Sequence, residues 1–184
     1  MARLVAPGVS LQTSFLAALT EYQAEGRHLE LDVAALADPG EFARYVAALA
    51  ADVERPGEPD RYAAALTGVP AAAAPEGGYV PQTTLWWVAG DEYLGRIGIR
   101  HYLTDGLRRR GGHIGFEVRP SARSVGNATV MLGAVLPVAA GLHIHPAHVD
   151  CDSDNVASRR VIEKNGGILE REEGGSLYFL VPTR

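Results

Sequence analysis

The sequence contains almost no cysteine and no long hydrophobic run. Cys151 is the only cysteine among 184 residues, which excludes an intrachain disulfide and a cysteine-rich metal site. The longest apolar stretch, residues 130–140, is too short to span a bilayer and contains Pro137. No apolar segment of the signal-peptide type follows Met1. We therefore expect a cytoplasmic protein that does not enter a membrane.

A surplus of positive charge is also missing. The formal net charge of −5 argues against nucleic acid and anionic membranes as partners and favours a cationic amine. The one basic cluster, Arg108–Arg110, is predicted to be a solvated turn between strands. A hydrophobic fraction of 47% over 184 residues fits one folded domain that spans residues 1–184.

The first part of the chain shows helical periodicity. Apolar residues at helical spacing predict helices over residues 11–25 and 41–53, the second after the start signal Asp38-Pro39. Residues 56–81 are rich in proline, glycine and alanine and are predicted to form a long surface loop.

The pattern changes to strands from Thr83 onward. Strands and helices are predicted in the order expected for an α/β protein whose sheet carries helices on both faces. The predicted strands cover residues 85–88, 93–101, 114–118, 147–151 and 177–181, and the predicted helices cover residues 126–140 and 155–165. Trp86 and Trp87 are expected to point to opposite faces of their strand.

One segment, Val118–Thr129, has the pattern of an anion-binding turn. A strand ends, the chain turns, and a helix begins at Gly126. The first turn of a helix offers unpaired N–H groups and partial positive charge, which suit a phosphate. Arg123 is placed to add a charge-assisted hydrogen bond. The spacing Arg-x-x-Gly-x-Ala also fits an ordinary helix start, so the spacing alone leaves both interpretations open.

The surrounding residues give this segment a family resemblance. Residues 123–128 match Gln/Arg-x-x-Gly-x-Gly/Ala, the motif of the GNAT acetyltransferase superfamily, at its three defined positions. The preceding residues 112–120 resemble the strand before that motif. Residues 152–158 and 161–167 resemble the second signature, an asparagine before a helix that ends in Glu-Lys-x-Gly. The resemblance covers residues 83–181 and is closest to a bacterial branch of predicted acetyltransferases.

The resemblance implies a fold and a co-substrate. The fold would be the GNAT fold, of the α+β type, with a mixed central sheet of about six to seven strands. Its sheet would splay between the fourth and fifth strands, residues 113–118 and 147–151, and acetyl-CoA would lie in the resulting V. Residues 83–181 would form the cofactor-binding core, and residues 1–80 would supply the N-terminal helices and a loop.

The resemblance also implies the residues that bind acetyl-CoA. The backbone of the fourth strand would pair with the pantetheine arm, and the N–H groups of Ser124 to Ala128 would hold the pyrophosphate. Asn155 would reach the pantetheine or the sulfur. The complete expected set is Phe116, Glu117, Val118, Arg123, Ser124, Val125, Gly126, Asn127, Ala128, Thr129, Asn155 and Ser158.

The family chemistry is direct attack of an amine on the thioester. His113 is a candidate for removing the amine proton, and Glu117 is a candidate for a water relay or for binding the amine. Roughly 13 Å of strand separates them, so they cannot form a tight catalytic pair. The alternatives are a histidine bonded to backbone and a salt bridge from Glu117 to Arg119. The tyrosine that protonates the thiolate in many relatives corresponds to Ile162, so Tyr178, another residue or solvent would serve.

The sequence departs from the family pattern elsewhere as well. Ser124, Val125 and Asn127 stand where relatives often carry arginine, lysine or an aromatic residue, which predicts weaker CoA binding. Pro137 is expected to kink the last turn of the cofactor helix.

No metal site is expected. The nearby residues His143, His145, His148, Asp150 and Asp152 have no spacing that fixes a coordination geometry, so surface histidines are the preferred interpretation. Cys151 is interpreted as a small buried hydrophobic residue rather than a nucleophile.

Two functions remain open at this point. The first is acetyl transfer from acetyl-CoA to a small-molecule amine or a peptide N-terminus. The second is a non-catalytic acyl-CoA-binding relative that acts as a sensor or interaction module. A homodimer is expected because residues 177–181 look like an exposed edge strand.

Overall fold

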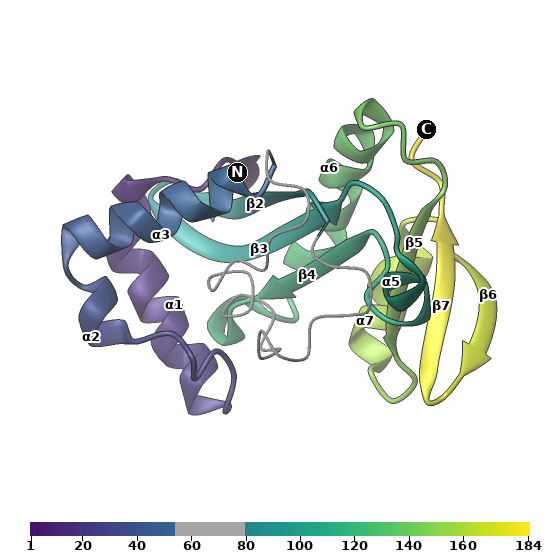
Figure 1. Ribbon diagram of the computed structural model, residues 1–184. Coiled ribbons are helices and arrows are strands. Elements are labelled where there is room, and N and C mark those ends of the chain that lie inside the picture. Colours follow the sequence, from purple (N-terminus) through teal and green to yellow (C-terminus); the bar gives the residue numbers. More distant parts are fainter. Residues whose placement is uncertain (54–79) are drawn as a thin grey trace.

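The computed structural model describes residues 1–53 and 80–184. Nearly all of the predicted loop at 56–81 therefore lies outside the described residues. The described strands form two sheets in which every paired neighbour is antiparallel, and the sheets have the orders β1-β2-β3-β4 and β5-β7-β6 (Figure 1). The strands are β1 Arg3–Val5, β2 Gln82–Ala89, β3 Glu92–Arg100, β4 Ile114–Val118, β5 Ala147–Asp152, β6 Ile168–Glu173 and β7 Ser176–Val181.

Four of the described helices begin at a residue whose side chain caps them. Asp38 accepts hydrogen bonds from the backbone N–H groups of Gly40 and Glu41, and Pro39 occupies the first turn of α3. Asp32 caps α2 in the same way. The described α-helices are α1 Gln12–Ala24, α2 Val33–Leu36, α3 Pro39–Ala51, α5 Asp105–Arg109, α6 Asn127–Gly141 and α7 Val156–Lys164.

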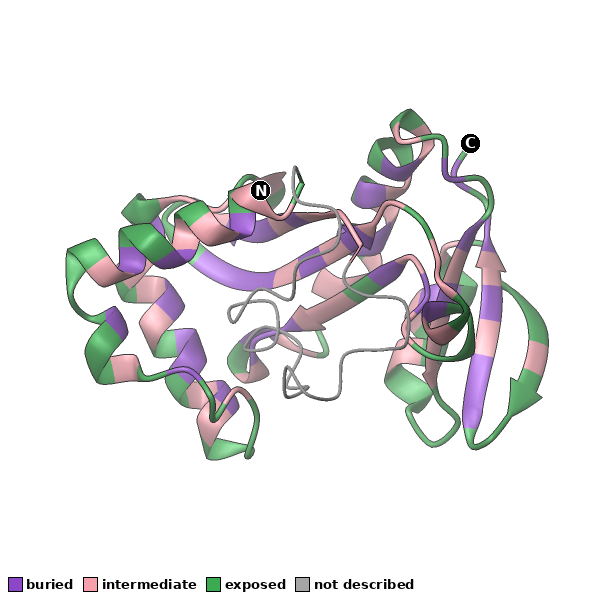
Figure 2. Ribbon diagram, in the orientation of Figure 1, coloured by how far each residue is buried: buried purple, intermediate pink, exposed green. Residues whose placement is uncertain are grey.

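Helices cover both faces of the first sheet. Helices α1 and α3 pack on one face and α6 on the other, so two hydrophobic cores share β2 and β3 (Figure 2). Trp86 lies in the α1–α3 core and Trp87 in the α6 core, which confirms that they point to opposite faces. Along β3, Ile97 and Ile99 face α6, so the alternating residues face the other way. This alternation places Arg96 on the α1 side.

The two sheets meet at one end of β4 and β5. The backbone N–H of His113 donates to the carbonyl oxygen of His148 over 2.7 Å. No ladder pairing joins β4 to β5 in the described part of the chain. The expected GNAT fold, with its splay between these two strands and helices on both faces, is therefore confirmed.

The structure corrects several details of the expected secondary structure. Helices α2 and α5 and strands β1 and β6 were not predicted. Arg108 and Arg109 end α5 instead of forming a turn, although both are exposed as expected. Strand β7 pairs on both sides and is not an edge; β6 is the edge strand, and Figure 2 shows it largely exposed. Helix α6 continues through Pro137 to Gly141.

Candidate functional site

The turn between β4 and α6 holds two residues in the left-handed region. Ser124 has φ 64° and Gly126 has φ 90°. A β-carbon on Gly126 would meet no atom within 4 Å, so the space in front of this turn is open. The first N–H groups of α6 have no partner within the helix, and Gly126, Asn127 and Ala128 line an open cleft. The geometry is that of an anion site at a helix N-terminus.

Asn127 holds this turn in place. Its Oδ1 accepts a hydrogen bond from the indole Nε1–H of Trp87 over 3.0 Å. Its Nδ2 donates to the carbonyl oxygen of Ala122 over 3.0 Å. An amide side chain can do both, whereas the cations common in relatives can only donate. The asparagine at position 127, which departs from the family pattern, therefore has a structural role: it fixes the turn.

We expect Asn127→Ala to destabilise the fold by about 1–3 kcal/mol, because the Trp87 indole N–H loses its partner. Trp87 is only 3% exposed, so water does not replace the amide readily. Urea unfolding measures the loss, and Trp87→Phe provides the matched background. If Asn127→Ala costs as much in the Trp87→Phe protein as in the unaltered one, the bond to the indole is not the cause.

Arg123 points toward α1 rather than into open space. Its Nε donates to the carbonyl oxygen of Val118 over 3.0 Å. Its two terminal nitrogens form a bidentate pair with the carboxylate of Glu25, both at 2.8 Å. The guanidinium therefore ties the turn to the C-terminal end of α1.

A cleft of about 680 Å³ opens in front of the turn. Every residue expected to bind acetyl-CoA lines this cleft except Val125, whose side chain is 76% exposed. Asn155 lies at the rim and caps α7, because its Oδ1 accepts a hydrogen bond from the N–H of Ser158 over 3.0 Å. The structure thus brings together residues from β4, the turn, α6 and α7.

Helix α7 supplies two cations that the motif did not indicate. Arg160 and Lys164 both line the cleft. Neither forms a salt bridge with any described residue of the chain. Their spacing of four residues places them on one helical face, a signal that the sequence contained but that was not used.

Glu117 lies at the inner end of this cleft within a cluster of cations. Its carboxylate pairs with Arg96 and with Arg27, the latter at 2.7 Å, and the Nε2 of His28 lies 3.0 Å from both oxygens. Burial raises the pKa of Glu117, but Arg96, His28 and Arg27 outweigh it and lower that pKa to about 2. The predicted salt bridge between Glu117 and Arg119 is wrong, because Arg119 pairs with Glu21.

His28 was missed by sequence reasoning. It lies between α1 and α2 with φ 53°, a left-handed conformation that is uncommon outside glycine. The side chain of Gln23 stabilises this conformation by donating to the carbonyl oxygens of His28 at 3.1 Å and Leu31 at 2.6 Å. An isolated histidine in a predicted loop carries no local signal of its contact with Glu117, 89 positions away.

A second pocket, of about 240 Å³, lies on the α1 side of β4. Polar residues of β2 and β3 line it, together with His28. Arg27, Phe116 and Glu117 belong to both the cleft and this second pocket. The two spaces therefore meet at the middle of β4.

The sequence matches a model of the acetyltransferase (GNAT) domain over residues 19–168, more than half of the chain. The chain belongs to the GNAT acetyltransferase family. It is an acyltransferase. No curated protein matches it in sequence.

Several solved structures share the fold of this GNAT protein. RimJ of Mycobacterium smegmatis in complex with CoA-disulfide has a TM-score of 0.60 and 17% identity, covering 98% of this chain and 81% of RimJ. The putative acetyltransferase yncA of Salmonella typhimurium, solved with acetyl-CoA, has a TM-score of 0.58 and 11% identity, covering 100% and 94%. An acetyltransferase of Salmonella typhimurium that modifies the N-terminal serine of ribosomal protein L7/L12 has a TM-score of 0.57 and 15% identity, covering 97% and 92%.

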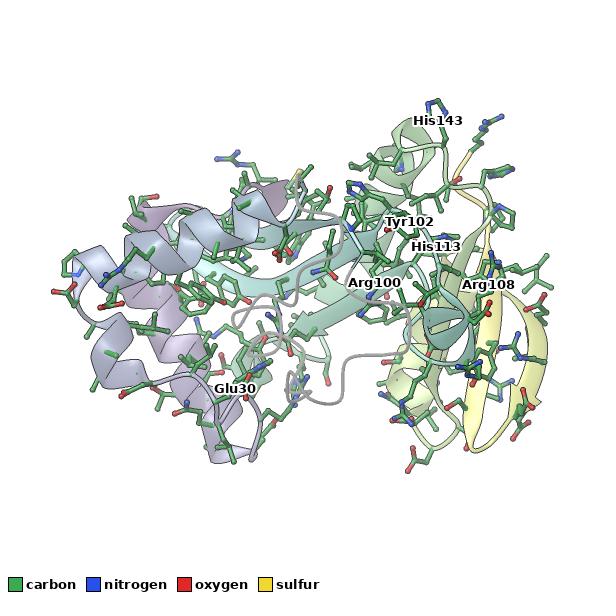
Figure 3. All side chains as sticks on the ribbon, in the orientation of Figure 1. Glu30, Arg100, Tyr102, Arg108, His113 and His143 are labelled. Carbon is green, nitrogen blue, oxygen red and sulfur yellow. The ribbon has the colours of Figure 1, made fainter. Side chains whose placement is uncertain are left out.

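His113 of this GNAT protein lines neither space. Its Nδ1 accepts a hydrogen bond from the backbone N–H of His148 over 3.0 Å, in addition to the backbone bond between the same residues. Figure 3 shows His113 beside Arg100, where the two sheets meet. Burial, reinforced by His148, Arg108 and Arg100, lowers the pKa of His113 to about 4. The geometry matches the alternative interpretation, a histidine bonded to backbone.

Tyr178 also lines neither space. Its hydroxyl donates to the carbonyl oxygen of Arg109, and the guanidinium carbon of Arg171 lies 3.8 Å from the centre of its ring. Ile162, at the position of the family's tyrosine, is completely buried in the α6 core. The GNAT protein therefore presents no tyrosine hydroxyl from either of these two positions.

The remaining candidates show no reactive geometry. Cys151 is half-buried, and burial, with Asp150 next, raises the pKa of its thiol to about 11. Within residues 1–53 and 80–184, no group of three or more His, Cys, Asp or Glu side chains is placed to hold a metal ion.

Proposed function

We propose that this protein is an N-acetyltransferase that moves the acetyl group of acetyl-CoA to a primary amine of a small molecule or peptide. The observation that carries this proposal is the meeting of two spaces at Phe116 and Glu117. One space suits a long phosphorylated donor, and the other suits a small polar acceptor. A shared boundary allows both to be bound at once, which favours direct attack in a ternary complex.

Acetyl-CoA would occupy the larger cleft. The backbone of Phe116 to Val118 would pair with the pantetheine arm, and the N–H groups of Ser124 to Ala128 would bind the pyrophosphate. The thioester would then lie beside Phe116 and Glu117, next to the second pocket. Two solved structures with the same fold support this donor, because one contains acetyl-CoA and the other contains CoA-disulfide.

In the reaction, the amine nitrogen would attack the thioester carbonyl carbon. The C–N bond forms, the C–S bond breaks, the nitrogen loses one proton and the departing thiolate of CoA gains one. A backbone N–H of β4 would stabilise the oxyanion. Glu117 is the carboxylate that reaches both spaces, and we assign it the role of orienting the amine. We assign His113 and Tyr178 positioning roles, His113 between β4 and β5 and Tyr178 between β7 and α5.

The proposal is tested in two steps. Acetyl-CoA at 100 times its Kd should stabilise the protein by about 2.7 kcal/mol, which raises Tm by roughly 5–10 °C. Thiol release from acetyl-CoA is then followed across a panel of amines and peptide N-termini. No stabilisation at millimolar acetyl-CoA would overturn the donor assignment.

The alternative function is acyl-CoA binding without catalysis. Ile162 favours it, because its side chain has no proton to give to the thiolate, and so does Glu117, whose low pKa makes it a weak base. Amine-dependent thiol release above the background hydrolysis rate would eliminate this alternative. Stabilisation by acetyl-CoA without such release would support it.

The cations of α7 should strengthen donor binding. We expect the double variant Arg160→Ala/Lys164→Ala to raise the Kd for acetyl-CoA about tenfold, because two charge-assisted contacts to phosphate are lost. Isothermal titration at two salt concentrations measures the change. Arg159→Ala is the matched control, since Arg159 lies on the same helix, pairs with Glu163 and does not line the cleft. An equal loss in both variants would contradict the assignment.

The proposal also covers the domain organisation and the location of the protein. We propose a single acyltransferase domain over residues 1–184, because β2 and β3 contribute to both hydrophobic cores. The presence of one cysteine supports a cytoplasmic location. Of the helices in the described segments, none combines the length and the apolar character needed to cross a membrane.

We also propose a homodimer, with the edge strand β6 as its contact instead of residues 177–181. Equilibrium sedimentation at tens of micromolar protein tests it. A purely monomeric distribution would contradict the dimer.

A further inference from the structure

Arg100 is a half-buried cation on the wall of the second pocket. Its terminal nitrogen donates to the carbonyl oxygens of Gly111 over 2.7 Å and Gly112 over 3.1 Å. No salt bridge joins it to any residue in the two described segments. Burial lowers the pKa of Arg100, and the opposing effect of Asp150 does not restore it. A half-buried cation that forms no salt bridge within the described segments can bind an anion that enters this pocket.

The pocket around Arg100 has an excess of positive charge. Among the described residues, its lining contains three arginines, Arg27, Arg96 and Arg100, and one acid, Glu117. That acid pairs with both Arg96 and Arg27, so the described lining carries more arginines than carboxylates. His28 also lines this pocket.

Two further carboxylates lie behind this wall. Glu30 approaches the Nδ1 of His28 at 3.4 Å, and Asp150 accepts a hydrogen bond from the N–H of Gly111 over 3.0 Å. Neither lines the pocket. Figure 3 shows Arg100 between the two sheets and Glu30 far from it, beside the connection between α1 and α2. The electropositive wall is therefore a local feature of a protein whose net charge is −5.

We infer that the acceptor carries an anionic group, a carboxylate or a phosphate, close to its amine, and that Arg100 and Arg27 bind this group. The inference rests on the proposed acetyltransferase function, because it treats the second pocket as the acceptor site. It replaces the cationic acceptor expected from the net charge. A pocket of about 240 Å³ is smaller than a typical drug-sized site, which fits a small acceptor.

The same charges help to explain how the amine loses its proton. Nearby positive charge disfavours the ammonium form and lowers the pKa of an amine. Positive charge that the acceptor's own anion leaves unbalanced would thus favour the neutral, nucleophilic amine. The anionic group of the acceptor offsets the repulsion and holds the amine beside Phe116.

Matched amines test the inference directly. β-Alanine is compared with propylamine, and O-phosphoethanolamine with ethanolamine, by thiol release from acetyl-CoA. At least one anionic member should exceed its neutral partner in kcat/KM by tenfold or more, and the two pairs distinguish carboxylate from phosphate. The same compounds should bind with the same preference to the protein saturated with CoA, where no turnover occurs.

Variants locate the effect. Gln82→Glu places a carboxylate of nearly identical shape in the pocket and should reduce the preference for the anionic amine at least tenfold. Arg100→Met should do the same, whereas Arg100→Lys should keep part of the preference because the charge remains. Arg108→Gln is the control, since Arg108 is exposed and lies outside the pocket. All four proteins should retain their stabilisation by acetyl-CoA.

The outcomes separate the two proposals. Neutral amines that react as well as anionic ones, with acetyl-CoA binding intact, would overturn this inference and leave the acetyltransferase assignment standing. An unchanged preference in Gln82→Glu would overturn the assignment of the anion to this pocket. Absence of any acetyl-CoA binding in the unaltered protein would remove the proposed function and this inference together.

Discussion

Gly126→Trp is expected to abolish the stabilisation that acetyl-CoA gives to the protein. The new side chain would occupy the open space in front of the turn, where the pyrophosphate is proposed to bind. At φ 90° it would also strain the backbone from which α6 begins. The expected ligand-dependent rise in Tm of roughly 5–10 °C should fall to zero, as measured by thermal shift across an acetyl-CoA titration.

Gly90→Trp is the matched control for this experiment. Gly90 lies in the turn between β2 and β3 with φ 63°, and a β-carbon there also meets nothing within 4 Å. Its substitution carries a similar backbone strain without blocking the cleft. Gly90→Trp should lower the starting Tm and keep the full shift with acetyl-CoA. A full shift in Gly126→Trp would show that the donor binds elsewhere.

Glu117→Gln is expected to destabilise the fold by about 3–5 kcal/mol, because it breaks the largely buried ion pairs that Glu117 makes with Arg96 and Arg27. The side chain of Glu117 is 9% exposed and that of Arg96 is 16% exposed, so water compensates only in part. Urea unfolding at pH 7 measures the loss. Glu163→Gln, which breaks a solvent-exposed pair on α7, should leave the stability nearly unchanged. If Glu117→Gln lost as little stability as Glu163→Gln, the stabilising role of the Glu117 ion pairs would be contradicted.

The stability difference between the unaltered protein and Glu117→Gln should depend on pH, because the pKa of Glu117 is lowered in the folded protein. The carboxyl of Glu117 has a pKa of about 2 in the folded protein, against a usual value of 4.5. A lowered pKa means that the stabilisation is complete above pH 4.5 and is lost as the pH falls toward 2. The gap between the unaltered protein and Glu117→Gln should therefore narrow over this window. A gap that stays constant from pH 7 to pH 3 would refute the assignment.

The cofactor segment was predictable because its signal is local. Residues 114–118 form β4 as predicted, and α6 begins one residue after Gly126, at Asn127. Strand alternation, the helix start and the motif all lie within a short stretch of chain. Strand β1, with three residues, is too short to show a period, and it depends on its pairing with β2.

The second pocket was not predictable because its contacts are long-range. His28 meets Glu117 across 89 positions, and the contact depends on a left-handed turn that Gln23 stabilises. Arg100 lies within the strand predicted over residues 93–101, and nothing local distinguishes it there. Its place on the pocket wall arises only on folding, which no sequence pattern reports.

The pair between Arg123 and Glu25 links the two halves of the site. Glu25 ends α1, and the chain continues directly into Arg27 and His28 on the wall of the second pocket. A donor phosphate that draws Arg123 away from Glu25 would release the segment that shapes the acceptor pocket. One surface ion pair thus joins the turn in front of the cleft to the segment that lines the second pocket.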